Sequence, residues 1–343
     1  MRLLIIGNRG GTNVGECFER AAVSSGVSVR LIEANQAMEA PQWLRRLNWH
    51  LRGHRPTRLH PFSDAVRQVC DDLQPHIVLT TGLSPVTGET LARIGSAGVL
   101  RVNYLTDDPW SKAHRARWFM KALMQYDFVF SPRRANIGDL KAAGCRVVEY
   151  VPFGYDPAIH FVERDAATYS SYESDILFVG GADRERIPYC RAIREAGFRL
   201  SLYGDYWDRY RETRDAFRGY ADVRVLRLAT SAAKVCLCLV RRGNRDGHVM
   251  RTFEMAAMEG CMLIEDTPEH REIFGADGEA VLYFRSIQNM VDRARWLLQH
   301  ETERKRLAAT AHARITRGHH TYADRLQAML ETADLKPQPL LLG

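Results

Sequence analysis

The chain has 343 residues, of which 45% are hydrophobic and 26% charged, and its formal net charge is +7. This length is too great for one ordinary core and predicts two domains of about 150 residues each. The composition is that of a folded protein, and no apolar run approaches the roughly 18 residues that a membrane-spanning helix requires.

The positive charge belongs mainly to the N-terminal part of the chain. Residues 1–157 carry 20 Lys and Arg against 14 Asp and Glu, whereas residues 158–343 carry 28 against 27. A basic surface of this kind fits nucleic acid, anionic lipid or a phosphorylated substrate. We expect no nucleic-acid partner, because the sequence contains no recognisable reading motif or aromatic platform.

The N-terminus and the cysteines favour a cytoplasmic protein. Residues 2–6 are apolar and lead into glycine-rich sequence, which predicts an opening β-strand rather than a signal peptide. The seven cysteines are scattered without zinc-ligand spacing, so we expect buried, reduced thiols and no metal site. Cys236 and Cys238 alternate with apolar residues, as neighbours in a core strand do.

A glycine-rich loop follows the first strand and precedes a helix expected over residues 16–25. The centre of the loop is Gly10, Gly11, Thr12 and Asn13. Glycines between a strand and a helix let the backbone approach a phosphate or a sugar, and we predict that these residues line a ligand-binding cleft. A purely structural tight turn is the alternative, because the spacing differs from the dinucleotide-binding pattern G-x-G-x-x-G.

Residues 27–33 predict a second strand, and residues 41–60 then predict a basic amphipathic helix. Its apolar residues at near-helical spacing are Trp43, Leu44, Leu47 and Leu51, and its basic residues are Arg45, Arg46, Arg52, Arg55 and Arg58. A basic helix with a tryptophan is typical of segments that lie on an anionic membrane. A peripheral contact of residues 42–60 with the inner face of the membrane is therefore one of two interpretations. The alternative is a helix packed on the sheet with a solvated basic face.

Two further buried strands are predicted at residues 76–82 and 100–110, and the second of them ends in the paired aspartates Asp107 and Asp108. In parallel-sheet proteins, ligand-facing residues follow the carboxyl ends of strands. Paired carboxylates can bind a hydroxylated substrate, and a neighbouring like charge raises one pKa toward that of a general base. Asp-Asp-Pro is also a common turn and helix-start sequence.

Pro152 and Pro157 interrupt regular structure after a strand at residues 145–151 and predict a domain boundary, so that residues 1–157 form an N-terminal domain. The second half restarts the pattern, with strands predicted at residues 174–181, 198–204, 223–226, 233–240 and 280–284. Residues 158–318 are therefore expected to form a second doubly wound α/β domain. Residues 319–343 are expected to form a helix that returns to the first domain, followed by a tail.

The stretch at residues 247–268 contains charged residues at the beginning of a predicted helix. Residues 248–254, His-Val-Met-Arg-Thr-Phe-Glu, open a helix that we expect to end at Gly260, where a C-terminal glycine is typical. Residues 261–264 predict a buried strand that runs into a polar turn at residues 265–268. Charge at a helix N-terminus in an α/β protein favours an anionic or polyhydroxylated ligand.

These segments resemble the CgeB-like group of glycosyltransferases, within the broader glycosyltransferase group 1. The matching segments occur in the family's order at residues 106–109, 178–181, 202–204, 248–254, 265–269, 279–283 and 319–322. The resemblance implies the GT-B fold, in which two doubly wound Rossmann-like domains face each other across a cleft. It also implies that the C-terminal domain binds a nucleoside-diphosphate sugar, UDP-linked by preference.

The resemblance also implies roles for individual residues. Glu254 corresponds to the glutamate that accepts hydrogen bonds from the ribose, and Asp246 stands where an acidic residue, usually glutamate, lies near the transferred sugar. Arg251 is implied to neutralise the leaving diphosphate, with an Arg251–Glu254 ion pair within the helix as the alternative. Arg184 and Arg186 are second candidates for the diphosphate. The other implied donor-binding positions are Gly180, Gly181, Tyr203, His248, Glu265, Asp266 and Thr267.

The sequence thus leads to the hypothesis of sugar transfer from the donor to a glycan, lipid-linked or small-molecule acceptor, as in polysaccharide biosynthesis. The N-terminal domain would hold the acceptor, with Gly10 to Asn13 lining its side of the cleft and Asp107, Asp108 and Arg251 as catalytic residues. We expect no metal and no cofactor besides the donor, because no Asp-x-Asp motif lies near the donor segments. A nucleotide-sugar epimerase and a non-catalytic carbohydrate or coat interaction protein are the alternatives.

Overall fold

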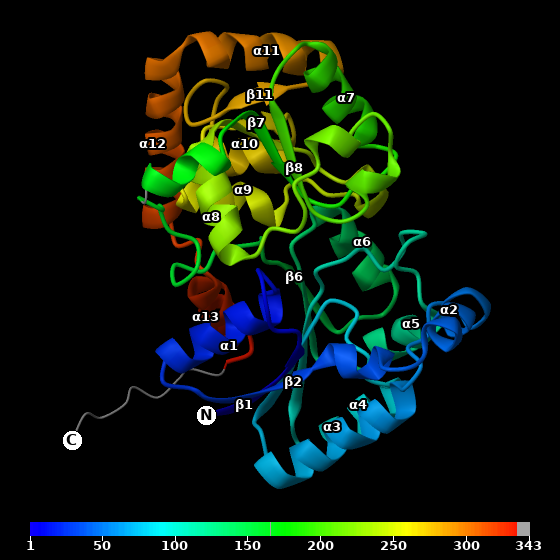
Figure 1. Ribbon diagram of the computed structural model, residues 1–343. Coiled ribbons are helices and arrows are strands. Elements are labelled where there is room, and N and C mark those ends of the chain that lie inside the picture. The colour runs from blue at the N-terminus through cyan, green and yellow to red at the C-terminus, as the bar shows by residue number, and fades with distance from the viewer. Residues whose placement is uncertain (165, 335–343) are drawn as a thin grey trace. The chain divides into compact units, whose positions relative to one another are not determined.

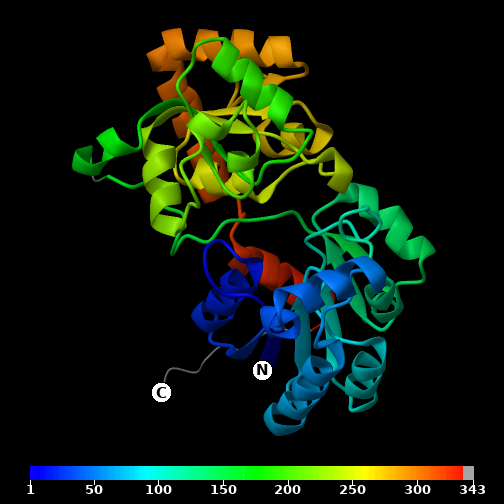
Figure 2. The same cartoon turned by 45° about the vertical axis from the view of Figure 1, so that its right-hand side comes forward.

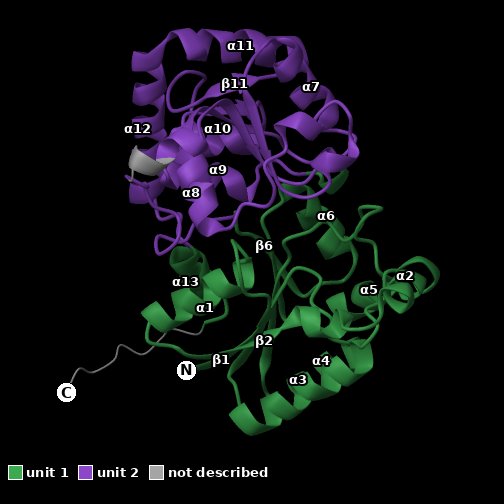
Figure 3. Ribbon diagram, in the orientation of Figure 1, with its two compact units in different colours: residues 1–152, 243–245, 322–343 green, residues 153–242, 246–321 purple. Residues whose placement is uncertain are grey.

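The structure is a computed structural model that describes residues 1–164 and 166–334. It divides into two compact units, drawn in green and purple in Figure 3. Unit 1 contains residues 1–152, residues 243–245 and the described residues from Tyr322 onward, and unit 2 contains residues 153–242 and 246–321. Among the described helices, none combines the length and the apolar character that crossing a membrane requires.

Unit 1 is built on a six-stranded parallel sheet with the strand order β2-β1-β3-β4-β5-β6. The strands are β1 (Arg2–Gly7), β2 (Ser28–Glu33), β3 (Ile77–Thr81), β4 (Leu100–Tyr104), β5 (Phe128–Ser131) and β6 (Val147–Tyr150). The chain reverses its direction of winding between β1 and β3, which makes the carboxyl ends of these strands a topological switch point. The glycine-rich loop leaves the sheet at this point.

Helices cover both faces of this sheet, as the views in Figures 1 and 2 show. They are α1 (Val14–Ser24), α2 (Gln42–Leu51), α3 (Leu59–Leu73), α4 (Gly88–Ser96), α5 (Arg117–Leu123), α6 (Arg134–Ala142) and α13 (Tyr322–Thr332), with a short 3-10 helix η1 (Ala34–Met38). Leu4 and Ile6 of β1 pack with Phe62 of α3. Leu3 and Leu326 line a small apolar cavity on the other face, because successive strand residues point to opposite sides.

The last helix, α13, belongs to unit 1 although the chain reaches it from unit 2. It packs on α1, and the rings of Phe18 and Tyr322 meet edge to face with their centroids 5.4 Å apart. Leu326 and Met329 of α13 are buried. Aromatic and aliphatic burial of this kind holds a terminal helix to a domain that is distant in sequence.

Unit 2 contains a five-stranded parallel sheet with the order β11-β10-β9-β7-β8. The strands are β7 (Ser174–Val179), β8 (Leu200–Tyr203), β9 (Ala233–Cys238), β10 (Met262–Glu265) and β11 (Leu282–Phe284). The helices are α7 (Ile187–Glu195), α8 (Val223–Ala232), α9 (Met250–Ala257), α10 (Pro268–Phe274), α11 (Ile287–Gln299) and α12 (Glu301–Arg317), with 3-10 helices η2 (Ala166–Ser171), η3 (Trp207–Arg209) and η4 (Arg214–Ala216). A further 3-10 helix, η5 (Arg242–Asn244), spans the point where the chain passes into unit 1. The switch point of this sheet lies between β7 and β9.

The strand predicted at residues 223–226 is wrong, because these residues begin α8. Asp222 caps the helix, and its carboxylate accepts a hydrogen bond from the amide of Val225 at 2.7 Å. Leu226 and Ala229, three residues apart, are both buried. The short alternation of apolar residues with arginine fits a strand equally well, and the N-cap selects the helix.

The basic segment at residues 41–60 is also not one helix. The helix α2 ends at Leu51, and α3 begins at Leu59. Gly53 and His54 have φ values of 61° and 59°, in the left-handed region. Gly53 adopts this conformation without a steric cost, and Pro56 lacks the backbone donor that a continuous helix needs.

The sequence predicted that α9 ends at Gly260, but Gly260 is not the left-handed residue at the end of this helix. That residue is Glu259, with a φ of 60°. A Cβ atom at Gly260 would lie 2.9 Å from Cγ2 of Thr230 and 3.0 Å from Sγ of Cys236. The glycine is therefore required by close packing against α8 and β9 and not by its backbone dihedral angle.

The seven cysteines are free and buried, which confirms the prediction of buried thiols. Cys236 and Cys238 lie on β9. Burial raises the pKa of the Cys238 thiol to about 12, so the thiol is protonated at neutral pH. These residues are part of the core of unit 2.

Candidate functional site

The carboxyl edge of the unit 2 sheet presents glycine backbone. The strand β7 ends at Val179 and runs into Gly180 and Gly181, and β8 ends at Tyr203, before Gly204. The amide of Gly180 donates to the carbonyl of Tyr203 at 2.9 Å. Gly204 has a φ of 124°, and a Cβ atom there would lie 2.6 Å from the carbonyl oxygen of Gly180. The two strand ends thus pack backbone against backbone. This packing places three predicted donor-binding residues, Gly180, Gly181 and Tyr203, close together.

Arg186 is a buried cation beside this glycine turn. Its Nη1 donates to the carbonyl of Gly181 at 2.9 Å, and its guanidinium carbon lies 5.3 Å from the centre of the Phe178 ring. Its Nε lies 3.6 Å from Oδ2 of Asp183 and makes no hydrogen bond within the described part of the chain. The side chain is 9% exposed, so this donor is removed from bulk water. A buried guanidinium with an unsatisfied donor favours an anionic partner.

A second arginine, Arg241, lies close to Arg186. Nε of Arg241 is 3.7 Å from Oδ2 of Asp183, the same oxygen that Arg186 approaches. Burial lowers the pKa of Arg186, and the charge of Arg241 lowers it further, while Asp183 and Asp246 partly offset both effects. The two cations therefore repel each other across one shared carboxylate. An anion bound there would relieve this repulsion.

Arg241 and the next residue, Arg242, were not among the site residues predicted from the sequence. They follow β9 at the carboxyl edge, and Arg242 donates both to Glu265 and, at 3.0 Å, to the hydroxyl of Tyr189. The rule that ligand-facing residues follow strand ends would have found them. Arg184 is exposed and has no ion-pair partner among residues 1–164 and 166–334.

The helix α9 positions Arg251 and Glu254 three residues apart. The carboxylate of Glu254 is fully buried, and its Oε2 accepts a hydrogen bond from Nη1 of Arg251. Its Oε1 lies 3.5 Å from Nε2 of His160, which is also buried. The Arg251 side chain is 22% exposed. The intrahelical ion pair that the sequence left as an alternative is thus formed, and the ribose-binding role of Glu254 stays a prediction.

His248 is buried next to this helix. Its Nε2 accepts a hydrogen bond from the amide of Phe153 at 3.2 Å. Its ring meets those of Phe153 and Phe253 edge to face, with centroids 5.6 and 5.5 Å away. Asp246, two residues earlier, is partly exposed and lies within electrostatic range of Arg186. The structure therefore brings Asp246, rather than His248, toward the basic site.

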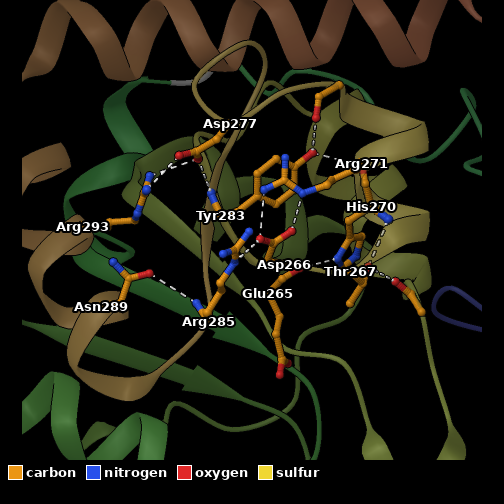
Figure 4. Close-up of polar contacts among 12 residues, drawn as sticks. Glu265, Asp266, Thr267, His270, Arg271, Asp277, Tyr283, Arg285, Asn289 and Arg293 are labelled. Atoms are coloured by element: carbon orange, nitrogen blue, oxygen red, sulfur yellow. Dashed lines mark hydrogen bonds and ion pairs between the residues drawn. The ribbon is translucent and has the colours of Figure 1, made fainter.

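The carboxylates at the end of β10, Glu265 and Asp266, have different environments (Figure 4). Glu265 is 8% exposed, accepts from the amide of Val240 at 3.2 Å, and is paired with Arg242. Burial raises its pKa, although Arg242 opposes the shift. Asp266 accepts from Arg271 at 2.5 and 2.9 Å and from Arg285 at 2.6 Å. These bonds, led by that from Arg271, lower the pKa of Asp266 to about 2.

Thr267 caps the next helix, α10. Its Oγ1 accepts from the amide of His270 at 3.0 Å and donates to the carbonyl of Gly247. His270 is fully buried, and its Nδ1 donates to the carbonyl of Glu265 at 2.7 Å. Figure 4 shows Asp266, Thr267 and His270 grouped around this turn. The bonds fix the chain after β10 against residue 247, immediately before α9.

In unit 1, the predicted loop residues Gly10 to Asn13 form an ordered turn after β1. The Asn13 side chain donates to the carbonyls of Gly10 and Arg9 at 2.5 and 3.2 Å. The amide of Gly10 donates to the Glu16 carboxylate at 2.6 Å. Gly10 and Gly11 have φ values of 86° and 59°, which glycine adopts without strain. These bonds provide the tight turn of the alternative interpretation, and the contact with an acceptor stays a prediction.

Asp107 and Asp108, also in unit 1, differ in their exposure and in their hydrogen-bond partners. Asp108 is 1% exposed and accepts from Arg245 at 2.6 and 3.1 Å, from Asn136 at 2.9 Å and from the Trp110 amide at 2.9 Å. Burial raises its pKa, but these hydrogen bonds, led by Arg245, outweigh burial, and the net pKa is lowered. Asp107 has a 37% exposed side chain, 3.7 Å from Nε2 of His114. Among the described residues, no group of three acidic, histidine or cysteine side chains could hold a metal ion.

Comparison with known proteins gives a family match over part of the chain and a fold match over nearly all of it. Residues 184–331 match the family model described as glycosyl transferase-like. No curated protein matches the chain significantly.

Several solved structures share the fold over nearly the whole chain. Sucrose-phosphate synthase from Thermosynechococcus elongatus has a TM-score of 0.71 at 12% identity, covering 97% of this chain and 98% of that one. HepE from Anabaena in complex with UDP-glucose has a TM-score of 0.67 at 12% identity, covering 97% and 99%. UDP-GlcNAc 2-epimerase from Neisseria meningitidis bound to UDP-GlcNAc has a TM-score of 0.56 at 12% identity, also covering 97% and 99%. The chain therefore has the GT-B fold, and its residues 184–331 match a glycosyl transferase-like domain.

Proposed function

We propose that the protein is a glycosyltransferase that moves a sugar from a nucleoside-diphosphate sugar, UDP-linked by preference, to a glycan, lipid-linked or small-molecule acceptor. The match of residues 184–331 to a glycosyl transferase-like family supports the reaction class. A solved structure of the same fold, that of HepE from Anabaena, is a complex with UDP-glucose, which supports the donor class. Membership of the CgeB-like group, a hexosyl donor sugar and a cytoplasmic location belong to the same proposal.

The observation that carries this proposal is the arginine pair of unit 2. Arg186 is buried beside Gly181, and its Nε has no hydrogen-bond partner among the described residues. Arg241 and Arg186 both lie within 4 Å of the same carboxylate oxygen, Oδ2 of Asp183. A diphosphate supplies the oxygen acceptors that such a site lacks. Its charge also stabilises both guanidinium groups, which a neutral ligand could not do.

In this proposal the diphosphate is the leaving group of the transfer. Arg186 and Arg241 stabilise the negative charge that develops as the glycosidic bond breaks, with Arg184 and Arg251 as further cations of unit 2. Arginine neutralisation makes a metal ion unnecessary for this step. Addition of EDTA is accordingly expected to leave the transfer rate unchanged.

Glu254 is proposed as the ribose acceptor, in line with the resemblance. A carboxylate accepts from two neighbouring hydroxyl groups at once. The pairing with Arg251 and the full burial of Glu254 mean that the ribose must compete for this carboxylate. Binding of the donor therefore requires rearrangement of the Arg251–Glu254 pair.

For the acceptor side, we propose Asp107 rather than Asp108 as the carboxylate that meets the substrate. Asp108 is buried, and Arg245 and Asn136 occupy its oxygens. It is suited to hold the segment at residues 243–245 in place. Asp107 is more exposed, and it can accept a proton or a hydrogen bond from an acceptor hydroxyl.

A thermal-shift screen of UDP, GDP, ADP and TDP, with UMP and inorganic phosphate as controls, tests the donor class. A diphosphate at 100 times its dissociation constant stabilises the protein by about 2.7 kcal/mol, whereas the same concentration of UMP gives a smaller shift. Absence of a shift with every nucleoside diphosphate would contradict the proposal. It would favour a non-catalytic carbohydrate or coat interaction protein.

A nucleotide-sugar epimerase is the second candidate, because a solved structure of the same fold is a UDP-GlcNAc 2-epimerase. An epimerase converts the donor to an isomer without an acceptor and without release of the sugar. Proton NMR of a UDP-sugar incubated with the protein separates the two functions. Accumulation of an isomeric sugar would identify the epimerase, and appearance of UDP with a new glycoside would identify the transferase.

A further inference from the structure

The helix α2 of unit 1 exposes an apolar stripe to solvent. Trp43, Leu47 and Leu51 are 67%, 43% and 75% exposed. Their spacing of four residues places them on one side of the helix. Only Asn48 of this helix is buried. Three large apolar side chains on one exposed stripe are unusual for a surface that meets only water.

A basic pocket of about 660 Å³ lies along another side of the same helix. Its lining residues come from η1, from α2 and from the turn after it, and they include Glu39, Arg45, Arg46 and Arg55. Within the described residues, Arg45, Arg46 and Arg55 have no ion-pair partner. Glu39, the acidic lining residue, is paired with Arg58 at 3.0 Å. The pocket thus presents three uncompensated guanidinium groups.

The charge around α2 selects among the partners that could cover it. Residues 41–60 contain five arginines and no aspartate or glutamate. A second copy of this chain would bring two such segments together, and their repulsion opposes that contact. A nucleic acid would neutralise the arginines, but its phosphate backbone offers Trp43 and Leu51 no apolar partner. An anionic bilayer offers phosphate groups to the pocket and acyl chains to the stripe.

We propose that α2 docks the protein onto an anionic lipid bilayer. Trp43, Leu47 and Leu51 enter the boundary between headgroups and acyl chains, where tryptophan is favoured. Arg45, Arg46 and Arg55 bind lipid phosphates in the pocket. Of the acceptor classes considered above, this surface fits a lipid-linked acceptor, an extension that rests on the proposed function.

Co-sedimentation of the full chain with vesicles tests the docking. We expect binding to vesicles of equal parts phosphatidylglycerol and phosphatidylcholine, and at least tenfold weaker binding to pure phosphatidylcholine. Each arginine near an anionic surface contributes about a fivefold gain in partitioning, so high salt weakens the binding as well. Nucleotide binding by unit 2 is measured on the same preparations, so failure of the docking is distinguishable from failure of the proposed function.

Two double variants separate the contributions of the stripe and of the charge. Leu47→Ser with Leu51→Ser is expected to lower partitioning by about tenfold or more. Arg45→Gln with Arg46→Gln is expected to lower it by about thirtyfold on anionic vesicles. The matched controls are Val23→Ser, a 63% exposed residue of α1, and Arg211→Gln with Arg224→Gln, which are exposed in unit 2. Both controls are expected to bind as the natural protein does.

Three results would overturn the docking proposal. The first is equal binding of the natural protein and the Leu47/Leu51 variant, which would reduce the contact to electrostatic attraction. The second is the absence of binding to either vesicle. The third is self-association in sedimentation velocity that the Leu47/Leu51 variant abolishes, because the stripe would then be an interface between copies.

Discussion

Arg186 is the residue whose environment says most about function. It is buried, it lies beside Arg241, and its pKa is lowered first by burial and then by that neighbour. The sequence placed Arg186 after a diglycine turn and thereby made it a candidate. Its burial and its pairing with Arg241 could not be predicted, because the two arginines are 55 positions apart and meet only when β7 and β9 lie side by side.

Replacement of Arg186 by glutamine is expected to weaken binding of UDP and of pyrophosphate alike. A charge-assisted hydrogen bond contributes about 1.5–3 kcal/mol, so the loss in calorimetry is on the order of tenfold to hundredfold for both ligands. Arg191→Gln is the matched control, because Arg191 lies on α7, the helix that begins directly after Arg186, and is half exposed. Equal affinities for the Arg186 variant and this control would remove Arg186 from the site.

Glu254 gives a prediction with a different signature. Glu254→Gln removes a charged acceptor of ribose hydroxyls, and we expect UDP affinity to fall by about tenfold or more. Pyrophosphate affinity is expected to stay within about twofold, because pyrophosphate has no ribose. Urea unfolding of the same variant reports the cost of breaking the buried pair with Arg251. If UDP and pyrophosphate lost affinity equally, Glu254 would act through Arg251 and not on the ribose.

The two aspartates that follow β4 have environments that the sequence alone could not distinguish. Asp107 and Asp108 are adjacent and chemically identical, so the sequence could only propose both. Arg245, 137 residues later, selects Asp108 as its partner. Such a distant contact separates a buried, occupied carboxylate from an exposed one, and no local pattern carries that information.

At the scale of elements, the parallel strands were predictable because short apolar runs between polar turns are typical of buried strands. The helix α8 was not, because Val223 to Leu226 alternate with arginine and the cap at Asp222 decides the outcome. The end of α9 was assigned to the wrong residue for a similar reason. Gly260 stands where a terminal glycine is expected, but close packing against Thr230 and Cys236 is what requires it.

This assignment of Glu259 and Gly260 predicts opposite effects of two substitutions. Gly260→Ala forces a Cβ atom against Thr230 and Cys236 and is expected to lower the free energy of unfolding by about 1–3 kcal/mol. Glu259→Gly removes a left-handed non-glycine residue and is expected to raise it by about 0.5–1 kcal/mol. Denaturant unfolding measures both. A stabilised alanine variant, or a strongly destabilised glycine variant, would show that the end of α9 is described incorrectly.

The α10 turn predicts a pH dependence through His270. Burial lowers the pKa of His270 from 6.5 to about 4 in the folded protein. The unfolded chain therefore binds more protons between these values, and stability is fully present above pH 6.5 and falls as the pH decreases toward 4. The contribution of His270 to this loss is up to about 3 kcal/mol.

Urea unfolding at several pH values between 4 and 7 measures this contribution. His270→Gln is expected to reduce the slope of stability against pH in that window. His60→Gln, which changes an exposed histidine of α3, is the control and is expected to keep the slope of the natural protein. An unchanged slope for the His270 variant would mean that its imidazole is not held neutral by burial.

At the scale of the whole molecule, two parallel α/β domains follow from length, strand pattern and the break near residues 152–157. The charge difference between the halves also has a structural counterpart, because the arginines of α2 belong to unit 1. In unit 2, the strands β7 and β8 each run into a glycine, and these two strand ends are neighbours. Arg186 and Arg241 lie more than 50 residues apart in the sequence. The fold was therefore largely predictable, whereas the basic site depends on which strands are neighbours.

The central claim is that unit 2 binds a nucleoside diphosphate through the buried Arg186 and its partly exposed neighbour Arg241. Calorimetric titration of the full chain with UDP, followed by the same titration of the Arg186→Gln variant, tests it most directly. We predict one binding site for UDP in the natural protein and an affinity reduced by about tenfold or more in the variant. Failure of UDP, GDP, ADP and TDP to bind the natural protein, or UDP binding unchanged by the substitution, would contradict it.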